Sequence, residues 1–298
     1  MKILILGKGF ISEYLVNYLN DTDHSVECYS RKELDYSNDV TLYNKIVDDT
    51  EFGNAFDKGY EVVINTAGFT GSPNVDECEL RKAECFDLNV KLPKTIEGVC
   101  KASGINFINV SSGCIYTGYD KDYTEEDEPN FGMYNNEASF YSKTKHACEL
   151  TLDNSFTNTI RIRMPITSKD DHKNLLSKLN KYDNIIDFKN SKTDVIKLCE
   201  FIKVVVENFK PGIYNAVHNN TLTTREVTEI MTEYGLQNDN WKFVPYEDLP
   251  IKANRSNCVL DNSKAKRDFD FDFGDEEHYI RLNSHNFITS VLLFLKSI

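Results

Sequence analysis

The stretch KILILGKGFISEYLVNYL, residues 2–19, decides the fold. A short apolar run typical of a buried strand leads directly into GKG, and an amphipathic helical pattern follows. Backbone N–H groups at the start of such a helix can bind a pyrophosphate. Gly7 would allow the tight turn and Gly9 the close approach of a phosphate, while Phe10 and Ile11 open the helix beside it. Ser12 stands where a G-x-G-x-x-G loop has its third glycine.

Strand and helix patterns alternate through the first half of the chain. The strand-like runs SVECYS (25–30), EVVINTAG (61–68) and INFINVSS (105–112) are separated by amphipathic stretches. This alternation predicts an α/β fold with a Rossmann-type, doubly wound parallel sheet. We expect two units: a dinucleotide-binding domain over 1–164, to which 191–217 return, and a smaller C-terminal substrate-binding lobe over 165–190 and 218–298.

Composition excludes several classes of function. The net charge of -13 disfavours a nucleic-acid partner, because binding to phosphate backbones needs clustered Lys and Arg. No segment approaches the roughly 20 apolar residues that span a bilayer, and MKILIL is too short for a signal sequence, so we expect a cytoplasmic protein without a membrane partner. The eight cysteines show no metal-binding or disulfide spacing, and no metal site is expected. Seven of them are expected to be buried thiols, and Cys114 is the exception.

The end of the second predicted strand indicates which cofactor is bound. Ser30, Arg31 and Lys32 stand where a carboxylate would otherwise bind a ribose 2′-hydroxyl. Basic groups suit a 2′-phosphate, so the sequence favours NADPH over NADH, with NADH still possible. Asp35 could accept a hydrogen bond from the adenine amino group. A solvated basic turn is the alternative interpretation.

The segment FYSKTK, residues 140–145, supplies a candidate catalytic pair. Tyr141 and Lys145 are four residues apart, so both lie on one face of a helix. A neighbouring ammonium would lower the pKa of the phenol and make it a usable general acid for carbonyl chemistry. A surface pair at this spacing is the alternative. The hydroxyl of Ser112, at the end of a predicted strand, favours the catalytic interpretation.

The chain resembles an extended short-chain dehydrogenase/reductase. Within that superfamily it is most similar to the plant-type nucleotide-rhamnose synthases, which are epimerase/reductases, and more distantly to dTDP-4-dehydrorhamnose reductases. The segments that carry the resemblance span most of the chain: AGFTGSPNVDECE (67–79), SSGCIY (111–116), EEDEPNF (125–131), FYSKTK (140–145), RIRMPI (161–166) and RSN (255–257).

This resemblance implies a substrate and a reaction. UDP-4-keto-6-deoxy-glucose would be inverted at C3 and C5 and then reduced at C4, giving UDP-L-rhamnose. Both carbons are α to the ketone, so Ser112 and Tyr141 could stabilise an enolate and later an alkoxide. Cys114, two residues beyond Ser112 in an extended segment, would point to the same side as that hydroxyl and could move carbon-bound protons. The resemblance matches Lys178 to the residue that acts on the opposite ring face, although a solvated helical lysine is the default interpretation.

The resemblance also assigns supporting residues. The cofactor cleft would be lined by Asn65, Ala67, Gly68, Asn89, Met164 and Pro165. The sugar would meet Thr70, Gly71 and Asn74, and Arg255 would bind the UDP pyrophosphate. The resemblance further implies a homodimer, and the upstream 4,6-dehydratase would be a separate polypeptide.

Two other functions stay open. A plain 4-ketoreductase would receive an already epimerised UDP- or dTDP-sugar, and Cys114 speaks against it. A non-catalytic regulatory subunit that binds NADP need not keep Ser112, Tyr141 and Lys145 together, whereas this chain has all three.

Overall fold

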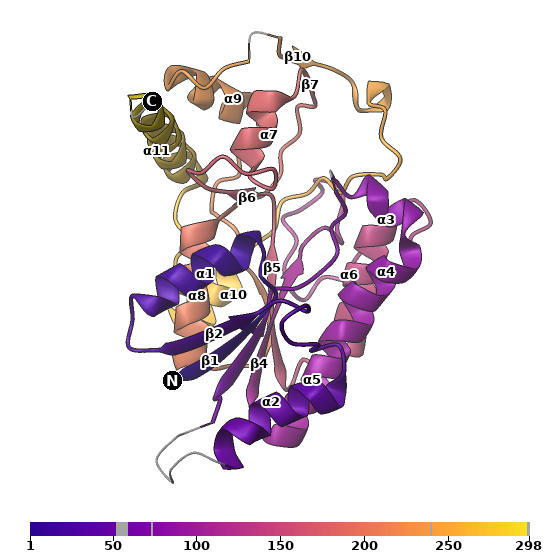
Figure 1. Cartoon of the computed structure of the whole chain (residues 1–298). Coiled ribbons are helices and arrows are strands. Elements are labelled where there is room, and N and C mark those ends of the chain that lie inside the picture. The colour runs from indigo at the N-terminus through magenta and orange to yellow at the C-terminus, as the bar shows by residue number, and fades with distance from the viewer. Residues whose placement is uncertain (52–58, 73, 239, 297–298) are drawn as a thin grey trace.

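The computed structural model describes residues 1–51, 59–72, 74–238 and 240–296. Six parallel strands form the central sheet in the order β2-β1-β3-β4-β5-β9 (Figure 1). Their bounds are β1 Lys2–Leu6, β2 Ser25–Tyr29, β3 Val62–Asn65, β4 Asn106–Ser112, β5 Thr157–Ile162 and β9 Gly212–Asn215. The predicted α/β Rossmann-type fold is confirmed. The strand order reverses between β1 and β3, where ligands of such sheets bind beyond the carboxyl ends of the strands.

Helices cover both faces of the sheet (Figure 1). One face carries α1 Phe10–Asn20, α8 Val195–Glu207 and α10 Ser263–Phe269, and the other carries α2 Asp39–Glu51, α5 Leu92–Ser103 and α6 Phe140–Thr151. Two short helices, α3 Asp76–Leu80 and α4 Lys82–Phe86, lead into α5. Strand residues such as Ile3 and Leu4 are fully buried on opposite faces, which explains why the strands read as continuous apolar runs.

A π turn over Asp87–Lys91 lies between α4 and α5. Pro93 lies in the first turn of α5. In a regular helix its ring would meet the carbonyl of Asn89, and the wider turn avoids that clash. Asn89 is consequently held in an unusual backbone geometry beside the predicted cofactor cleft.

Segments between β5 and α8, and others beyond β9, build a second, smaller layer above the sheet in Figure 1. It contains β6 Pro165–Ile166 paired with β8 Thr193–Asp194, β7 Asn184–Ile185 paired with β10 Lys242–Phe243, a 3-10 turn over Tyr246–Asp248, and the helices α7 Leu175–Lys181, α9 Thr224–Glu233 and α11 Glu276–Lys296. A separate apolar core includes Ile166, Leu179 and Met231. The buried ion pair of Lys192 and Glu276, 2.7 Å apart, ties α11 to β8.

A second buried ion pair fixes helix α6 on the sheet. Arg161 in β5 donates from Nε and Nη2 to the two carboxylate oxygens of Glu149 in α6, at 3.0 and 2.7 Å. Both side chains are almost fully buried. A bidentate pair in this setting sets the rotation of α6, and with it the direction of Tyr141 and Lys145. None of the described helices combines the length and apolar character that crossing a membrane requires.

Candidate active site

The glycine turn after β1 leaves room for a phosphate. Gly7 has φ +109°, and a Cβ there would lie 2.7 Å from the backbone nitrogen of Ala67, so only glycine fits between β1 and β3. A Cβ on Gly9 would meet nothing within 4 Å. Ser12 takes the place of the third glycine with its hydroxyl turned inward, where it accepts the Gly9 N–H at 2.7 Å. The loop therefore keeps an open approach to the start of α1.

Two buried asparagine side chains hold the loop after β3 in place. Asn65 is buried, donates to Asn109 at 2.8 Å and accepts the Ala67 N–H at 3.1 Å, so its amide fixes the start of the loop after β3. Asn89 accepts the Phe69 N–H at 2.7 Å and donates to the Phe69 carbonyl at 2.9 Å. A Cβ on Gly68 would lie 3.1 Å from Asn89 Oδ1 and 3.6 Å from Lys145 Nζ. The exposed Gly68 thus lets this loop approach the lysine closely.

An acidic side chain lies at the end of β2, contrary to the sequence analysis. Glu33 follows the strand by four residues and folds back, so that it accepts the Ser30 N–H and hydroxyl, both at 2.8 Å, and pairs with Lys8 at 2.5 Å. These hydrogen bonds lower the pKa of Glu33 to about 2, that from Lys8 most. Arg31 and Lys32 are exposed next to it, and Asp35 accepts the Ser37 N–H at 3.2 Å. The end of β2 therefore carries both positively and negatively charged side chains.

The helix that carries Tyr141 and Lys145 has a well-defined start. The hydroxyl of Ser139 accepts the Ser142 N–H at 3.1 Å, and a carboxylate oxygen of Glu79 accepts the Phe140 N–H at 2.6 Å. Lys145 Nζ lies 5.7 Å from the centre of the Tyr141 ring. Thr144, between the two, accepts from Asn89 at 3.1 Å. Asn89 therefore joins the cofactor-side loop to this helix, as an anchor for the segment that bears Lys145.

The neighbourhood of Tyr141 favours the neutral phenol. The side chain is 8% exposed. Burial raises its pKa most, negative charge at Cys114 adds to the rise, and a hydrogen bond with Ser112 opposes it. The expectation that Lys145 would lower the pKa of Tyr141 is therefore wrong, because desolvation of the phenolate outweighs the distant ammonium. The phenol is protonated at neutral pH and is available as a proton donor.

Cys114 lies beside Ser112, but a turn brings it there. Strand β4 ends at Ser112, and residues 113–115 bend away from the strand direction. The premise of a continuing extended segment is therefore wrong. The Ser112 hydroxyl nevertheless donates to Cys114 Sγ at 3.0 Å, and the Cys114 N–H donates back to Ser112 Oγ at 3.3 Å. The thiol is half-buried, and its sulfur is in contact with polar groups.

Sequence reasoning missed the group on the other side of this sulfur. Arg163, which follows β5, donates from Nη1 to Cys114 Sγ at 3.1 Å. Arg163 is 49 residues away along the chain, and its only sequence signal was a place inside RIRMPI. All eight cysteines are free; of the seven expected to be buried, Cys28 is half-buried.

Lys178 lies on α7, a helix of the second layer, and is half-buried. Its pKa is lowered by burial first and then by the positive charge of Lys173, with a further contribution from Arg255, while Asp171 opposes the shift. Arg255 therefore lies close enough to Lys178 for its positive charge to act on the amine.

The predicted sugar-side residues form a braced loop. Gly71 has φ +73°, and a Cβ there would lie 2.3 Å from the Asn74 carbonyl oxygen. Asn74 Oδ1 accepts the Asp76 N–H at 2.8 Å, and Thr70 is half-buried beside them. Asp76 in turn binds Arg255 Nη1 at 2.9 Å. This loop and the RSN segment are thus tied together, and Asp76 sets the direction of the Arg255 side chain.

Met164 has an unusual backbone conformation. Its φ of +33° is rare for a residue with a side chain, and such strain is concentrated at functional sites. Met164 and Pro165 are both half-buried at the start of the second layer. Next to them, the Thr167 hydroxyl donates to Tyr14 of α1 at 2.7 Å. The segment after Arg163 is therefore fixed against the helix that begins at the glycine turn.

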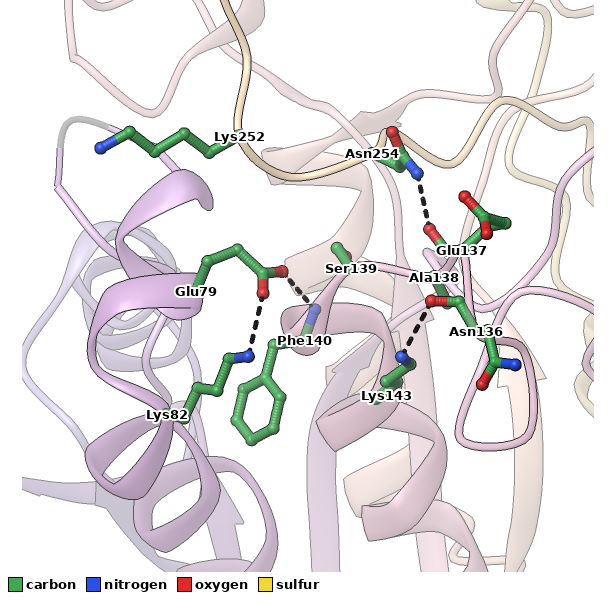
Figure 2. Close-up of a pocket in the computed structure, with 10 residues that line it drawn as sticks. All are labelled: Glu79, Lys82, Asn136, Glu137, Ala138, Ser139, Phe140, Lys143, Lys252 and Asn254. Carbon is green, nitrogen blue, oxygen red and sulfur yellow. Dashed lines mark hydrogen bonds and ion pairs between the residues drawn. The ribbon is translucent and has the colours of Figure 1, made fainter.

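A pocket flanks the start of α6 (Figure 2). Two contacts in it bridge separate segments: Glu79 with the Phe140 N–H, and Asn254 with the Glu137 carbonyl at 2.8 Å. Its lining residues are Glu79, Lys82, Asn136, Glu137, Ala138, Ser139, Phe140, Lys143, Lys252 and Asn254. Neither Ser112 nor Tyr141 is among them, so this pocket borders the candidate active site without containing its reacting groups.

The fold and the grouping of Ser112, Tyr141 and Lys145 beside a glycine turn define a short-chain dehydrogenase/reductase. Residues 1–281 match the RmlD substrate binding domain, and the chain belongs to that family. Its relatives are dTDP- and UDP-4-dehydrorhamnose reductases, several of which also carry an epimerase activity in their names.

The relatives from Arabidopsis thaliana include a bifunctional and a trifunctional protein. The bifunctional dTDP-4-dehydrorhamnose 3,5-epimerase/dTDP-4-dehydrorhamnose reductase is 36% identical over 220 residues, which are 70% of this chain and 71% of the relative. A trifunctional UDP-glucose 4,6-dehydratase/UDP-4-keto-6-deoxy-D-glucose 3,5-epimerase/UDP-4-keto-L-rhamnose-reductase is 35% identical over 220 residues, which are 70% of this chain and 32% of that protein.

Solved structures share the fold. The L780 UDP-rhamnose synthase of Acanthamoeba polyphaga mimivirus has a TM-score of 0.84 at 23% identity, covering 96% of this chain and 99% of that one. The dTDP-4-dehydrorhamnose reductase of Bacillus anthracis, solved in complex with NADP, has a TM-score of 0.78 at 17% identity, covering 97% and 99%.

Proposed function

We propose that this chain converts UDP-4-keto-6-deoxy-glucose into UDP-L-rhamnose by 3,5-epimerisation followed by NADPH-dependent reduction at C4. The observation that carries the proposal is the 3.0 Å contact between Ser112 Oγ and Cys114 Sγ, with Tyr141 adjoining both. A ketone beside Ser112 and Tyr141 would meet two hydrogen-bond donors at its oxygen. The sulfur would then be close to the carbons next to the carbonyl.

Epimerisation would proceed through an enolate. Cys114 takes a proton from C3 or C5, and the electron pair of the broken C–H bond moves to the ketone oxygen, where Ser112 and Tyr141 stabilise it. Lys178 returns a proton to the same carbon from the opposite face. Exchange with solvent then resets the thiol and the amine. The lowered pKa of Lys178 supports this role because burial and neighbouring positive charge make its ammonium a better proton donor.

Reduction would use the same hydrogen bonds. A bound nicotinamide supplies the hydride when NADPH is present. Tyr141, kept neutral by burial, gives its proton to the developing alkoxide, and the nearby ammonium of Lys145 stabilises the phenolate that results. Ser112 holds the oxygen in place. One polar arrangement thereby serves both halves of the reaction.

The glycine turn and the end of β2 fit a dinucleotide. The open approach at Gly9 suits the pyrophosphate, and Arg31 and Lys32 suit a 2′-phosphate. Met164 and Pro165 would contact the nicotinamide, while Phe10, Ile11, Ala67 and Gly68 would line the cleft. Asp35 would serve the adenine. The carboxylate of Glu33 limits the preference for NADPH because it occupies the Ser30 and Lys8 donors.

The substrate would lie between the two layers. We take residues 165–190 and 218–298 as the substrate-binding lobe, over a dinucleotide-binding domain of 1–164 to which 191–217 return. Thr70, Gly71 and Asn74 would meet the sugar, and Arg255, directed by Asp76, the UDP pyrophosphate. A separate 4,6-dehydratase would supply the keto sugar. We propose a cytoplasmic homodimer as the working form.

An isotope experiment tests this function. The protein is incubated with UDP-4-keto-6-deoxy-glucose in heavy water, with and without NADPH, and deuterium is located by mass spectrometry. The proposal expects label at C3 and C5 without NADPH, and labelled UDP-L-rhamnose with it. If the protein reduces an already epimerised sugar but incorporates no deuterium, it is a plain 4-ketoreductase. Binding of NADP(H) without either reaction would leave a regulatory subunit.

A further inference from the structure

Arg163 is a buried cation without a carboxylate partner. It is 2% exposed. Nη1 donates to Cys114 Sγ at 3.1 Å and to Ser256 Oγ at 2.9 Å, and Nη2 donates to Asn190 Oδ1 and to the Ser256 carbonyl, the latter at 3.2 Å. Nε is buried without a hydrogen-bond partner. Within the described part of the chain, no Asp or Glu oxygen lies within the 4.0 Å of an ion pair with this guanidinium.

Arg161, two residues earlier, shows the contrast. It is equally buried, yet its charge is balanced by the bidentate pair with Glu149. Removing a guanidinium from water without such a partner is energetically unfavourable. Arg163, which is surrounded by neutral acceptors, therefore provides a buried positive charge that an anion in the same site can balance.

The ionisable groups around Arg163 identify that anion. Cys258, Cys114 and Tyr119 are the groups whose negative charge would favour the charged guanidinium, and Tyr141 faces Cys114 from α6. Cys258 is fully buried, and its thiol sulfur lies 3.9 Å from Ser256 Oγ. Cys114 is half-buried, receives a hydrogen bond directly from Arg163, and adjoins the Ser112 hydroxyl. The sulfur of Cys114 is therefore the atom best placed to carry the charge.

We propose that Arg163 is the positioning residue that holds Cys114 as a thiolate, the form that removes a carbon-bound proton. This inference rests on the epimerase half of the proposed function. The thiolate takes the proton and becomes a thiol, the electron pair of the C–H bond moves onto the ketone oxygen, and Arg163 stays protonated throughout. The guanidinium also aims the sulfur, because it is itself held by Asn190 and Ser256 from two other segments.

The small residue between Ser112 and Cys114 belongs to the same arrangement. A Cβ on Gly113 would lie 2.4 Å from Leu260 Cδ1 and 3.3 Å from Arg163 Cδ. Glycine at this position therefore lets the stem of Arg163 pass under the turn and reach the sulfur. Ser112, Gly113 and Cys114 thus supply the hydroxyl, the space for the Arg163 side chain and the thiol in consecutive positions.

Alkylation of the thiol tests the inference without any substrate. Wild-type protein, Arg163→Met and Arg163→Lys react with iodoacetamide at pH 6, 7 and 8, and the rate at each cysteine is measured by peptide mass spectrometry. At pH 7, Cys114 of Arg163→Met is expected to react with iodoacetamide up to about tenfold more slowly than in the wild type. A change of one pH unit in the acidity of a thiol changes the fraction present as thiolate about tenfold. Arg163→Lys, which keeps the charge, should recover part of that rate. Cys28, the other half-buried thiol, is the internal control and should not change.

A structural role alone would not change the pH dependence. In Arg163→Met the rate at Cys114 should rise about tenfold for each pH unit, whereas the wild-type rate should rise less steeply. Equal rates and slopes in the two proteins would overturn the inference. If Arg163→Met does not fold, as judged by NADP(H) binding, the wild type decides: at pH 7, Cys114 should react faster in the folded protein than in concentrated urea, and a slower reaction would overturn it. A reactive thiol in a protein that shows no isotope exchange would leave Arg163's role standing while the proposed epimerase fails.

Discussion

Asn89 and Lys145 flank Gly68 so closely that a single added methyl group would lie 3.1 Å from the Asn89 amide oxygen and 3.6 Å from the Lys145 nitrogen. The π turn that carries Asn89, the loop after β3 and the helix α6 therefore meet at one glycine. This junction places the ammonium of Lys145 beside the loop after β3, while Tyr141, on the same helix, adjoins Ser112 and Cys114.

Replacing Tyr141 by Phe should separate binding from reduction. The variant keeps the ring and its packing but loses the proton that quenches the alkoxide. Net reduction, followed by NADPH absorbance, should fall about a hundred- to ten-thousandfold, while NADPH binding is retained. Tyr134→Phe is the matched control, because Tyr134 is 83% exposed and should not affect the rate. A Tyr141→Phe enzyme within tenfold of the wild type would remove Tyr141 from the mechanism.

Replacing Glu33 by Gln should increase the preference for NADPH. The change frees Lys8 and Ser30 for a 2′-phosphate and removes the carboxylate that would bind ribose hydroxyls of NADH. We expect the ratio of the NADH and NADPH dissociation constants, measured by calorimetry, to rise about fivefold. Asp23→Asn, at the far end of β2, controls for loss of charge. An unchanged ratio would show that Glu33 does not face the ribose.

Acid should destabilise the protein through His218. Its ring is 2% exposed, accepts the Asp194 N–H at 3.0 Å through Nε2, and lies 2.7 Å from the Phe273 carbonyl through Nδ1. Burial lowers the pKa of His218 to about 4, against opposing backbone hydrogen bonds from Phe273 and Gly274. The unfolded chain therefore binds this proton first as the pH falls, and stability present above about pH 6.5 is lost toward pH 4.

The expected loss from this group is about 3 kcal/mol across that window. Urea unfolding at pH 7, 5.5 and 4.5 measures it, and His218→Gln should flatten the difference between the three curves. Parallel loss of stability in the variant and the wild type would assign the acid sensitivity to other groups.

Local patterns in the sequence predicted the sheet, the glycine turn and the Tyr141–Lys145 pair, because strand and helix periodicity and the i,i+4 spacing are short-range signals. The features that the sequence did not reveal depend on distant segments. Arg163 reaches Cys114 only because Asn190 and Ser256 hold its guanidinium. Glu33 was overlooked because a turn, and not the strand, returns it to Ser30.

The pKa of Tyr141 likewise depends on contacts between distant segments that the sequence does not reveal. The sequence suggested that Lys145 would lower the pKa of Tyr141, but burial of the phenol is a property of the packed molecule and acts in the opposite direction. The Cys114 prediction reached the right neighbour through a wrong premise, since a turn and not an extended strand brings the sulfur beside Ser112.

Deuterium uptake by Cys114→Ala measures the central claim most directly. With UDP-4-keto-6-deoxy-glucose in heavy water and no NADPH, the wild type and a Cys28→Ala control should both incorporate label at C3 and C5. Cys114→Ala should incorporate none above the enzyme-free rate and still bind NADPH with unchanged affinity. Label at either carbon of the sugar at the wild-type rate in Cys114→Ala would contradict the account.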